Sequence, residues 1–140
     1  MAEPVFTGGC QCGAVRYSWG AALVSVPGAQ LAWTCGRPAE FRSSAIVARG
    51  FCASCGTPLH MKEDGDPIFE IAIGTLDNPE LAPPTEQAGV EAELSWFKSM
   101  PDLPRQRTQD YRTLEDLAKL RSLQHPDHDT RDWPPSKSSP

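Results

Sequence analysis

Alternation of apolar and polar side chains predicts several short β-strands in the first half of the chain. Residues 14–19 alternate with the period of a half-buried strand. Residues 21–26 and 30–33 predict two further strands, and the Pro-Gly pair at positions 27–28 favours a turn, so these two strands are expected to form a hairpin. Residues 37–44 predict another short strand.

A second hairpin is predicted in the middle of the chain. Residues 58–62 and 68–73 are rich in apolar side chains and flank the turn-rich sequence Glu-Asp-Gly-Asp-Pro at positions 63–67. Residues 92–98, which include two aromatic side chains, predict a returning strand. From these predicted strands the chain is expected to be mainly β, and its sequence contains no internal repeat.

The end of the chain has a different character. Thr113 precedes Asp116 by three residues, and leucines recur at positions 114, 117 and 120, so a short helix over residues 114–123 is predicted. From residue 125 onward the sequence is polar and rich in proline, which predicts a loosely ordered tail. We therefore expect a β domain over residues 1–108, followed by a C-terminal helix and tail over residues 109–140.

Composition and charge narrow the class of protein. A chain of 140 residues with 39% hydrophobic content is expected to form one domain with an ordinary core. Its 14 prolines and 11 glycines favour turns and short strands over a helical bundle. The formal charge of −5 argues against a nucleic-acid partner, since such proteins gather Lys and Arg on one face. No apolar run is long enough to span a bilayer, so no membrane partner is expected.

Four of the five cysteines form two close pairs that lie far apart in the sequence. Cys10 and Cys12 make a C-x-C pair, and Cys52 and Cys55 make a C-x-x-C pair of the spacing typical of zinc ribbons. Brought together, the pairs offer four thiolates in the tetrahedral arrangement that Zn²⁺ prefers. Glycine follows each pair and permits the positive φ that a backbone curling around an ion often needs. The pattern predicts one structural zinc ion held by Cys10, Cys12, Cys52 and Cys55.

Other uses of these cysteines stay open, namely a disulfide or redox pair and inert buried thiols. A disulfide framework is typical of short secreted chains, but residues 1–7 contain no basic segment followed by an apolar core. A thioredoxin-like C-x-x-C begins a helix, whereas Cys55 is followed by Gly-Thr-Pro, which does not propagate one. Metal binding is therefore favoured, and cysteines used as metal ligands predict a cytoplasmic protein.

Several motifs in a fixed order carry a resemblance to a known family. They are Gly-Gly-Cys-x-Cys-Gly-x-Val-Arg-Tyr at residues 8–17, Phe-Arg-Ser-Ser at 41–44, Arg-Gly-Phe-Cys-x-x-Cys-Gly-Thr-Pro-Leu at 49–59 and Gly-Thr-Leu-Asp at 74–77. In this combination the chain resembles the glutathione-dependent formaldehyde-activating enzymes. The resemblance extends from residue 6 to about residue 105.

The resemblance implies a fold, a metal and an activity. It implies coiled antiparallel sheets and a structural zinc on Cys10, Cys12, Cys52 and Cys55. It also implies a carbon–sulfur lyase that makes or breaks the bond between glutathione and the carbon of a small aldehyde, as in S-hydroxymethylglutathione. In the family that chemistry is associated with a second zinc, bound by a central C-x-C-x-x-C motif.

The central motif of the family is missing from this chain. Residues 15–19 join almost directly to residues 21–27, which resemble the segment that the family places after the missing cysteines. A catalytic zinc needs about three protein ligands and an open position, so we expect no second zinc, no catalytic residue and impaired lyase activity. Two alternatives stay open: a non-catalytic, zinc-stabilised binding or scaffold module, and a lyase that survives through Cys35 and a partner subunit.

Six further side chains have the chemistry to take part in a site. Cys35 is expected to be a small buried thiol, with a reactive thiol or compensating ligand as the alternative. His125 and His128 lie in a turn-prone segment where a solvated loop is favoured over a metal site. Three arginines could pair with glutathione carboxylates or, more simply, be exposed or paired with nearby acids: Arg16, Arg42 and Arg49.

Overall fold

The structure is a computed structural model that describes residues 6–9, 16–19, 25–88, 90–120, 122, 124–125 and 128–130. The chain divides into two compact units. The first comprises Met1–Pro83 together with Gln124–Pro140, and the second comprises Pro84–Leu123. The boundary expected at residue 108 stays a prediction.

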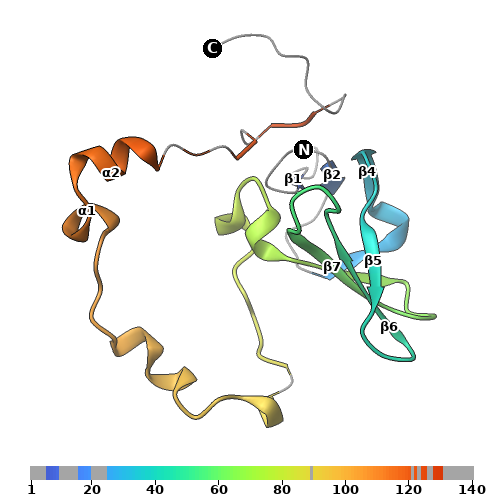
Figure 1. The fold of residues 1–140 in the computed structure, drawn as a ribbon. Coiled ribbons are helices and arrows are strands. Elements are labelled where there is room, and N and C mark those ends of the chain that lie inside the picture. The colour runs from blue at the N-terminus through green and yellow to red at the C-terminus, as the bar shows by residue number, and fades with distance from the viewer. Residues whose placement is uncertain are drawn as a thin grey trace. The chain divides into compact units, whose positions relative to one another are not determined.

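The first unit contains two antiparallel β-sheets (Figure 1). The smaller sheet has the strand order β1-β2-β4, with β1 at Phe6–Gly9, β2 at Arg16–Trp19 and β4 at Ala32–Cys35. The larger sheet has the order β3-β8-β7-β6-β5, with β3 at Ser25–Pro27, β5 at Ala39–Arg42, β6 at Val47–Phe51, β7 at Pro58–Glu63 and β8 at Ile68–Ile71. The expectation of a mainly β fold with antiparallel sheets is confirmed.

The hairpin expected from residues 21–26 and 30–33 is wrong. The strands at these positions, β3 and β4, belong to different sheets: β3 pairs with β8, and β4 pairs with β2. Between them the 3₁₀ turn η1 (Gly28–Gln30) is tied to the larger sheet, because the Gly28 N–H donates to the Pro67 carbonyl at 2.7 Å. This bond keeps the chain beside β8 at the point where a hairpin would have folded β4 back onto β3.

The hairpin of β7 and β8 is confirmed, and local chemistry explains it. Gly65 adopts a φ of +77°, a conformation that glycine reaches without steric cost. The Asp66 carboxylate accepts a hydrogen bond from the Ile68 N–H at 2.8 Å, as Asp side chains commonly do in turns. Both features depend on residues inside the turn, so the sequence alone could predict them.

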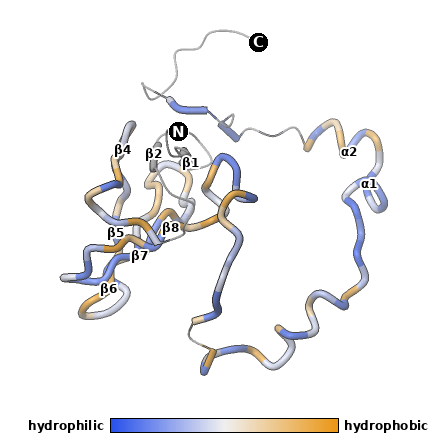
Figure 2. The backbone as a smooth tube through the Cα atoms, turned by 180° about the vertical axis from the view of Figure 1, so that it is seen from behind, coloured by the Kyte–Doolittle hydropathy of each residue, from blue (hydrophilic) through white to orange (hydrophobic). Residues whose placement is uncertain are grey.

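The core lies on one face of the larger sheet. Val26 of β3 and Ile71 of β8 are almost fully buried there. Four partly buried side chains pack against them: Leu31, Trp33, Phe69 and Leu76. Figure 2 shows hydrophobic and hydrophilic positions mixed along β7 and β8, as expected of strands with one face in the core. After β8 the chain leaves the sheet through two 3₁₀ turns, η2 (Ile73–Thr75) and η3 (Pro79–Leu81).

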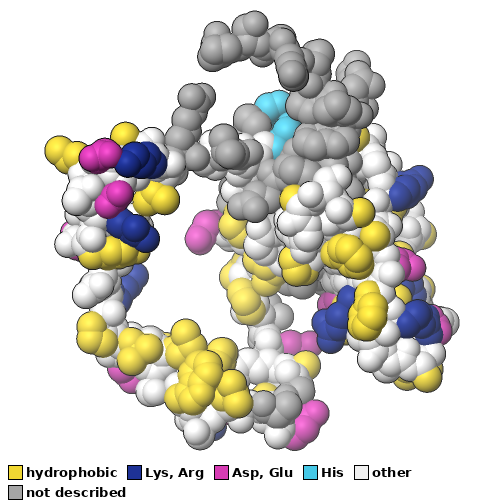
Figure 3. All heavy atoms as spheres, in the orientation of Figure 1, with side chains coloured by type: hydrophobic (Ala, Val, Ile, Leu, Met, Phe, Trp, Pro, Cys, Tyr) yellow, Lys and Arg dark blue, Asp and Glu magenta, His cyan; other side chains and the backbone are white. Residues whose placement is uncertain are grey.

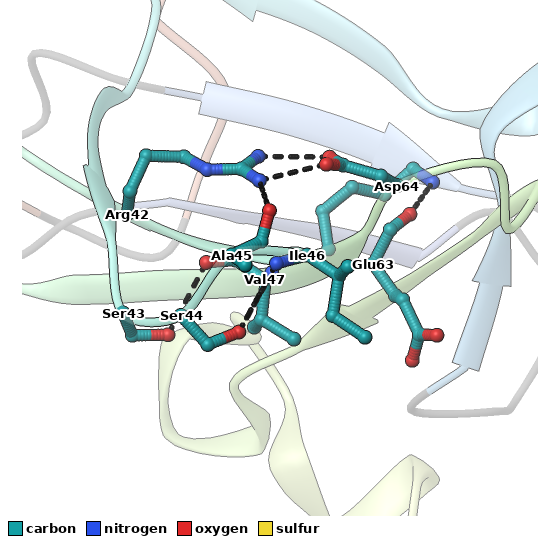
Figure 4. Close-up of polar contacts among 9 residues, drawn as sticks. Arg42, Ser43, Ser44, Ala45, Ile46, Val47, Glu63 and Asp64 are labelled. Carbon is teal, nitrogen blue, oxygen red and sulfur yellow. Dashed lines mark hydrogen bonds and ion pairs between the residues drawn. The ribbon is translucent and has the colours of Figure 1, made fainter.

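Arg42 connects the turn between β5 and β6 to the turn between β7 and β8 (Figure 4). The Arg42 guanidinium donates to both carboxylate oxygens of Asp64, at 2.8 and 2.7 Å, and also to the Ala45 carbonyl. These hydrogen bonds hold the pKa of the Asp64 carboxyl below its usual range. Both side chains are about half exposed, so solvent screening limits what the pair contributes to stability. The Ser44 hydroxyl accepts from the Val47 N–H at 3.1 Å in the same turn.

The second unit contains short helical turns, and the strand expected at residues 92–98 is wrong. Two 3₁₀ turns occupy this region, η4 (Val90–Ala92) and η5 (Phe97–Asp102). The Phe97 N–H donates to the Leu94 carbonyl at 2.9 Å. Such i to i−3 bonds satisfy the backbone locally, so it has no need of a strand partner. Hydrophobic side chains are exposed along this segment (Figure 3): Val90, Leu94, Trp96, Phe97, Met100 and Leu103.

The short helix near the end of the chain is confirmed. A single turn, α1 (Thr108–Tyr111), precedes α2 (Leu114–Lys119). The Thr113 hydroxyl accepts a hydrogen bond from the Asp116 N–H at 3.1 Å, which is the N-cap that the sequence predicted. The helix ends at Lys119 rather than at residue 123. Most of the tail that was expected to be loosely ordered lies outside the described residues. No helix in the described part of the chain is long and apolar enough to cross a membrane.

Candidate functional site

Residues 52–57, here called the cysteine turn, connect β6 to β7. Two backbone hydrogen bonds close it: the Cys52 N–H donates to the Thr57 carbonyl at 2.9 Å, and the Gly56 N–H donates to the Cys52 carbonyl at 2.7 Å. Gly56 has a φ of +75°, as expected for the residue after the second cysteine. The turn therefore holds its two cysteines on a backbone that curls back on itself.

The two thiols of the cysteine turn differ in exposure. Cys52 is 1% exposed, whereas Cys55 is exposed and its Sγ lies 3.1 Å from the Thr57 hydroxyl. Cys10 and Cys12 lie outside the described residues, so the four-cysteine site stays a prediction. No group of three or more His, Cys, Asp or Glu side chains among the described residues could hold a metal ion. The cysteine turn alone fits half of a tetrahedral thiolate site, and a second pair would have to complete it.

Cys35, the cysteine outside the two pairs, lies at the end of β4. It is 8% exposed, which agrees with the interpretation as a small buried thiol. No disulfide joins Cys35, Cys52 and Cys55 to one another. A buried thiol of this kind is poorly placed to serve as a nucleophile.

A cavity of about 300 Å³ lies beside the cysteine turn. It is lined by residues of β6, β7 and β8, including Arg49, Pro58, Met61 and Glu70. Pro58 is the first residue of β7 after the cysteine turn, so the cavity and the cysteine turn share one end of the larger sheet. The sequence predicted neither the cavity nor the part that Met61 and Glu70 play in lining it.

The three candidate arginines have different surroundings. Arg42 is paired with Asp64, which supports the interpretation that it pairs with a nearby acid. Arg49 lines the cavity, and no side chain in the described part of the chain forms an ion pair or hydrogen bond with its guanidinium. The side chain of Arg16 lies outside what the structure describes. Of the two arginines whose side chains the structure describes, Arg49 is therefore the one available to an anionic ligand.

His60 on β7 is a buried histidine that the sequence did not indicate as important. Its side chain is 1% exposed and packs against two aromatic rings, with centroid distances of 5.7 Å to Trp33 and 5.1 Å to Phe69. Its Nδ1 is buried and makes no hydrogen bond. Its Nε2 lies 4.0 Å from a carboxylate oxygen of Glu40. Burial lowers the pKa of His60 below 6.5, and the nearby Glu40 charge offsets part of that shift.

The lowered pKa predicts a pH dependence of stability. In the unfolded chain His60 gains a proton near pH 6.5, whereas in the folded protein it gains one only at a lower pH. The free energy of unfolding is therefore retained above pH 6.5 and falls as the pH drops below it. The difference in melting temperature between pH 7.5 and pH 5 is therefore expected to be smaller in His60→Leu than in the parent protein. His128→Gln, which changes an exposed histidine, should leave that difference as it is. An equal difference in all three proteins would show that His60 is not responsible.

The segment around His125 and His128 makes more contacts than a solvated loop would. The two imidazole rings lie 4.8 Å apart, and His125 Nε2 is 2.9 Å from the Thr130 hydroxyl. The Thr34 hydroxyl on β4 donates to the Asp129 carboxylate at 3.0 Å. The contact with Thr34 attaches the segment to the smaller sheet. Among the described residues, no third metal-ligating side chain joins the two histidines.

A family model described as glutathione-dependent formaldehyde-activating enzyme matches residues 10–91, which is more than half of the chain. The matched span contains the cysteine turn and the residues that line the cavity. No curated protein and no solved structure matches the chain.

Proposed function

The chain belongs to the glutathione-dependent formaldehyde-activating enzyme family, and from this premise we propose that it is a zinc-stabilised protein that binds glutathione or a glutathione–aldehyde adduct. The observation that carries the proposal is the closed cysteine turn, in which a buried and an exposed thiol are held on a backbone with a positive φ at Gly56. Such a turn fits half of a thiolate cage, and the pair formed by Cys10 and Cys12 has the composition to supply the other half.

In this proposal the zinc is structural. Four thiolates from Cys10, Cys12, Cys52 and Cys55 would saturate a tetrahedral ion and leave no open position for a substrate or water. The ion would clamp the N-terminal segment to the connection between β6 and β7. The function of the ion would then be to contribute folding free energy rather than to activate a thiol.

The carbon–sulfur lyase activity implied by the family is proposed to be impaired in this chain. The central C-x-C-x-x-C motif that would hold a catalytic zinc is missing, and Cys35 is the cysteine that remains. Its burial at the end of β4 argues against a role as a replacement nucleophile. Binding without turnover, as in a scaffold or sensor of glutathione adducts, is the alternative that this observation favours.

Metal content and turnover test the proposal together. Protein purified under reducing conditions is expected to contain about one zinc ion per chain, since four thiolates saturate one ion. Its rate of formation of the glutathione–formaldehyde adduct should stay at the spontaneous rate. A content of about two ions with turnover well above the spontaneous rate would contradict the structural role, because a second ion needs its own ligands. Protein without any zinc would contradict the proposed site itself.

A further inference from the structure

One row of side chains crosses the larger sheet beside the cysteine turn. Arg49 of β6 is directly opposite Met61 of β7, Met61 is opposite Glu70 of β8, and Glu70 is opposite Ser25 of β3. Residues that are directly opposite each other on neighbouring strands point to the same face of a sheet. A cation, a thioether, a carboxylate and a hydroxyl therefore share one face, and Arg49, Met61 and Glu70 all line the cavity.

The two charges in this row do not neutralise each other. Met61 separates Arg49 from Glu70, which places their backbones two strand spacings apart, or roughly 10 Å. No ion pair joins them in the described part of the chain. The cavity therefore presents a positive and a negative group on either side of an apolar side chain.

Glu70 is held in place from the side away from Met61. The Ser25 hydroxyl lies 3.0 Å from each of its two carboxylate oxygens. A single hydroxyl donates one proton, so the carboxylate keeps most of its lone pairs for another donor. The partly buried Glu70 is thus oriented by Ser25 and still able to accept hydrogen bonds from a ligand cation.

We propose that this cavity binds the zwitterionic γ-glutamyl end of glutathione. Arg49 would bind the α-carboxylate through a bidentate guanidinium pair, and Glu70 would accept the α-ammonium. The α-carbon that carries both groups, and the methylene chain that leads away from it, would lie against Met61, whose thioether adapts to irregular apolar groups. The inference rests on the proposed function, because that function supplies glutathione as the ligand. The glycyl end of glutathione carries a carboxylate but no ammonium, so it matches this row less well.

Binding measurements with two probes test the proposal. S-methylglutathione cannot form an aldehyde adduct, and its analogue with a glutaryl group in place of the γ-glutamyl group lacks only the ammonium. We expect calorimetry to show that the parent protein binds S-methylglutathione about tenfold or more tightly than the analogue, since a hydrogen bond to a charged group contributes that much. Glu70→Gln should remove this preference. Arg49→Gln should weaken binding of both probes by about tenfold or more.

Two exposed residues of the second unit provide matched controls. Arg105→Gln and Glu86→Gln make the same changes of charge and should leave both affinities unchanged. Unaltered melting temperatures of all four variants would show that they are folded. If the parent protein binds both probes equally and the variants change nothing, the inference is wrong while the proposed glutathione binding stands. If the parent protein binds neither probe, the proposed function and the inference both fail.

Discussion

Cys52→Ser is expected to yield a protein that has lost its zinc and melts more than about 10 °C lower, with a tendency to aggregate. The proposed cage joins two segments about forty residues apart, and structural zinc sites of this kind contribute on the order of several kcal/mol of folding free energy. For a domain of this size each kcal/mol corresponds to a few degrees of melting temperature. Elemental analysis and thermal unfolding of the reduced protein measure both effects.

The two thiols of the cysteine turn separate the role of the metal from the role of packing. Cys52 is buried, so replacing it also disturbs packing, whereas Cys55 is exposed and contributes little to the core. Cys55→Ser should nevertheless cause a similar loss of zinc and stability. Cys35→Ala removes a buried thiol outside the proposed cage and should keep the zinc. Full zinc content and an unchanged melting temperature in Cys55→Ser would rule out the cage.

Gly50→Ala is expected to destabilise the protein by about 3 kcal/mol, or on the order of 10 °C in melting temperature. A Cβ at position 50 would lie 2.1 Å from Nε2, 2.3 Å from Cδ2 and 2.7 Å from Cε1 of the His60 ring. The ring has little room to move away, because it is buried against Trp33 and Phe69. The added methyl group must therefore displace the imidazole or the strands around it. Urea unfolding of the variant measures the loss.

A second substitution tests whether the imidazole is the cause. In the background of His60→Ala, the Gly50→Ala change should cost less than about 1 kcal/mol, because the ring that it meets is gone. Gly74→Ala provides the matched control, since a Cβ there would meet no atom within 4 Å. An equal cost of Gly50→Ala with and without His60 would show that backbone conformation, not the close approach to the ring, requires glycine.

Features determined by neighbouring residues could be predicted from the sequence. The β7–β8 hairpin follows from Gly65 and Asp66 within its turn, and α2 begins where Thr113 caps it. The positive φ of Gly56 follows from its place after the second cysteine of a turn. In each case the hydrogen bonds or the steric freedom involve residues a few positions apart, so no distant partner is needed.

Two predicted strand arrangements were wrong, the first because more than one strand partner was possible and the second because local hydrogen bonds replaced a strand. Residues 25–27 and 32–35 have strand-like sequences, but these sequences do not specify which strand each will pair with. The Gly28 to Pro67 hydrogen bond and the packing of Val26 on Ile71 assign the first of them to β8. Residues 92–98 have aromatic and apolar side chains suited to a strand, yet local 3₁₀ bonds satisfy their backbone instead.

The sequence by itself determined the two cysteine pairs, the family to which the chain belongs and the turn that carries the second pair. Only the tertiary structure placed Arg49, Met61 and Glu70 in one row and set the His60 ring against Gly50. The physical reason is that alternation specifies which side chains share a face of one strand. Which side chains meet across strands depends on register, and register is set by pairing and packing between residues distant in the chain.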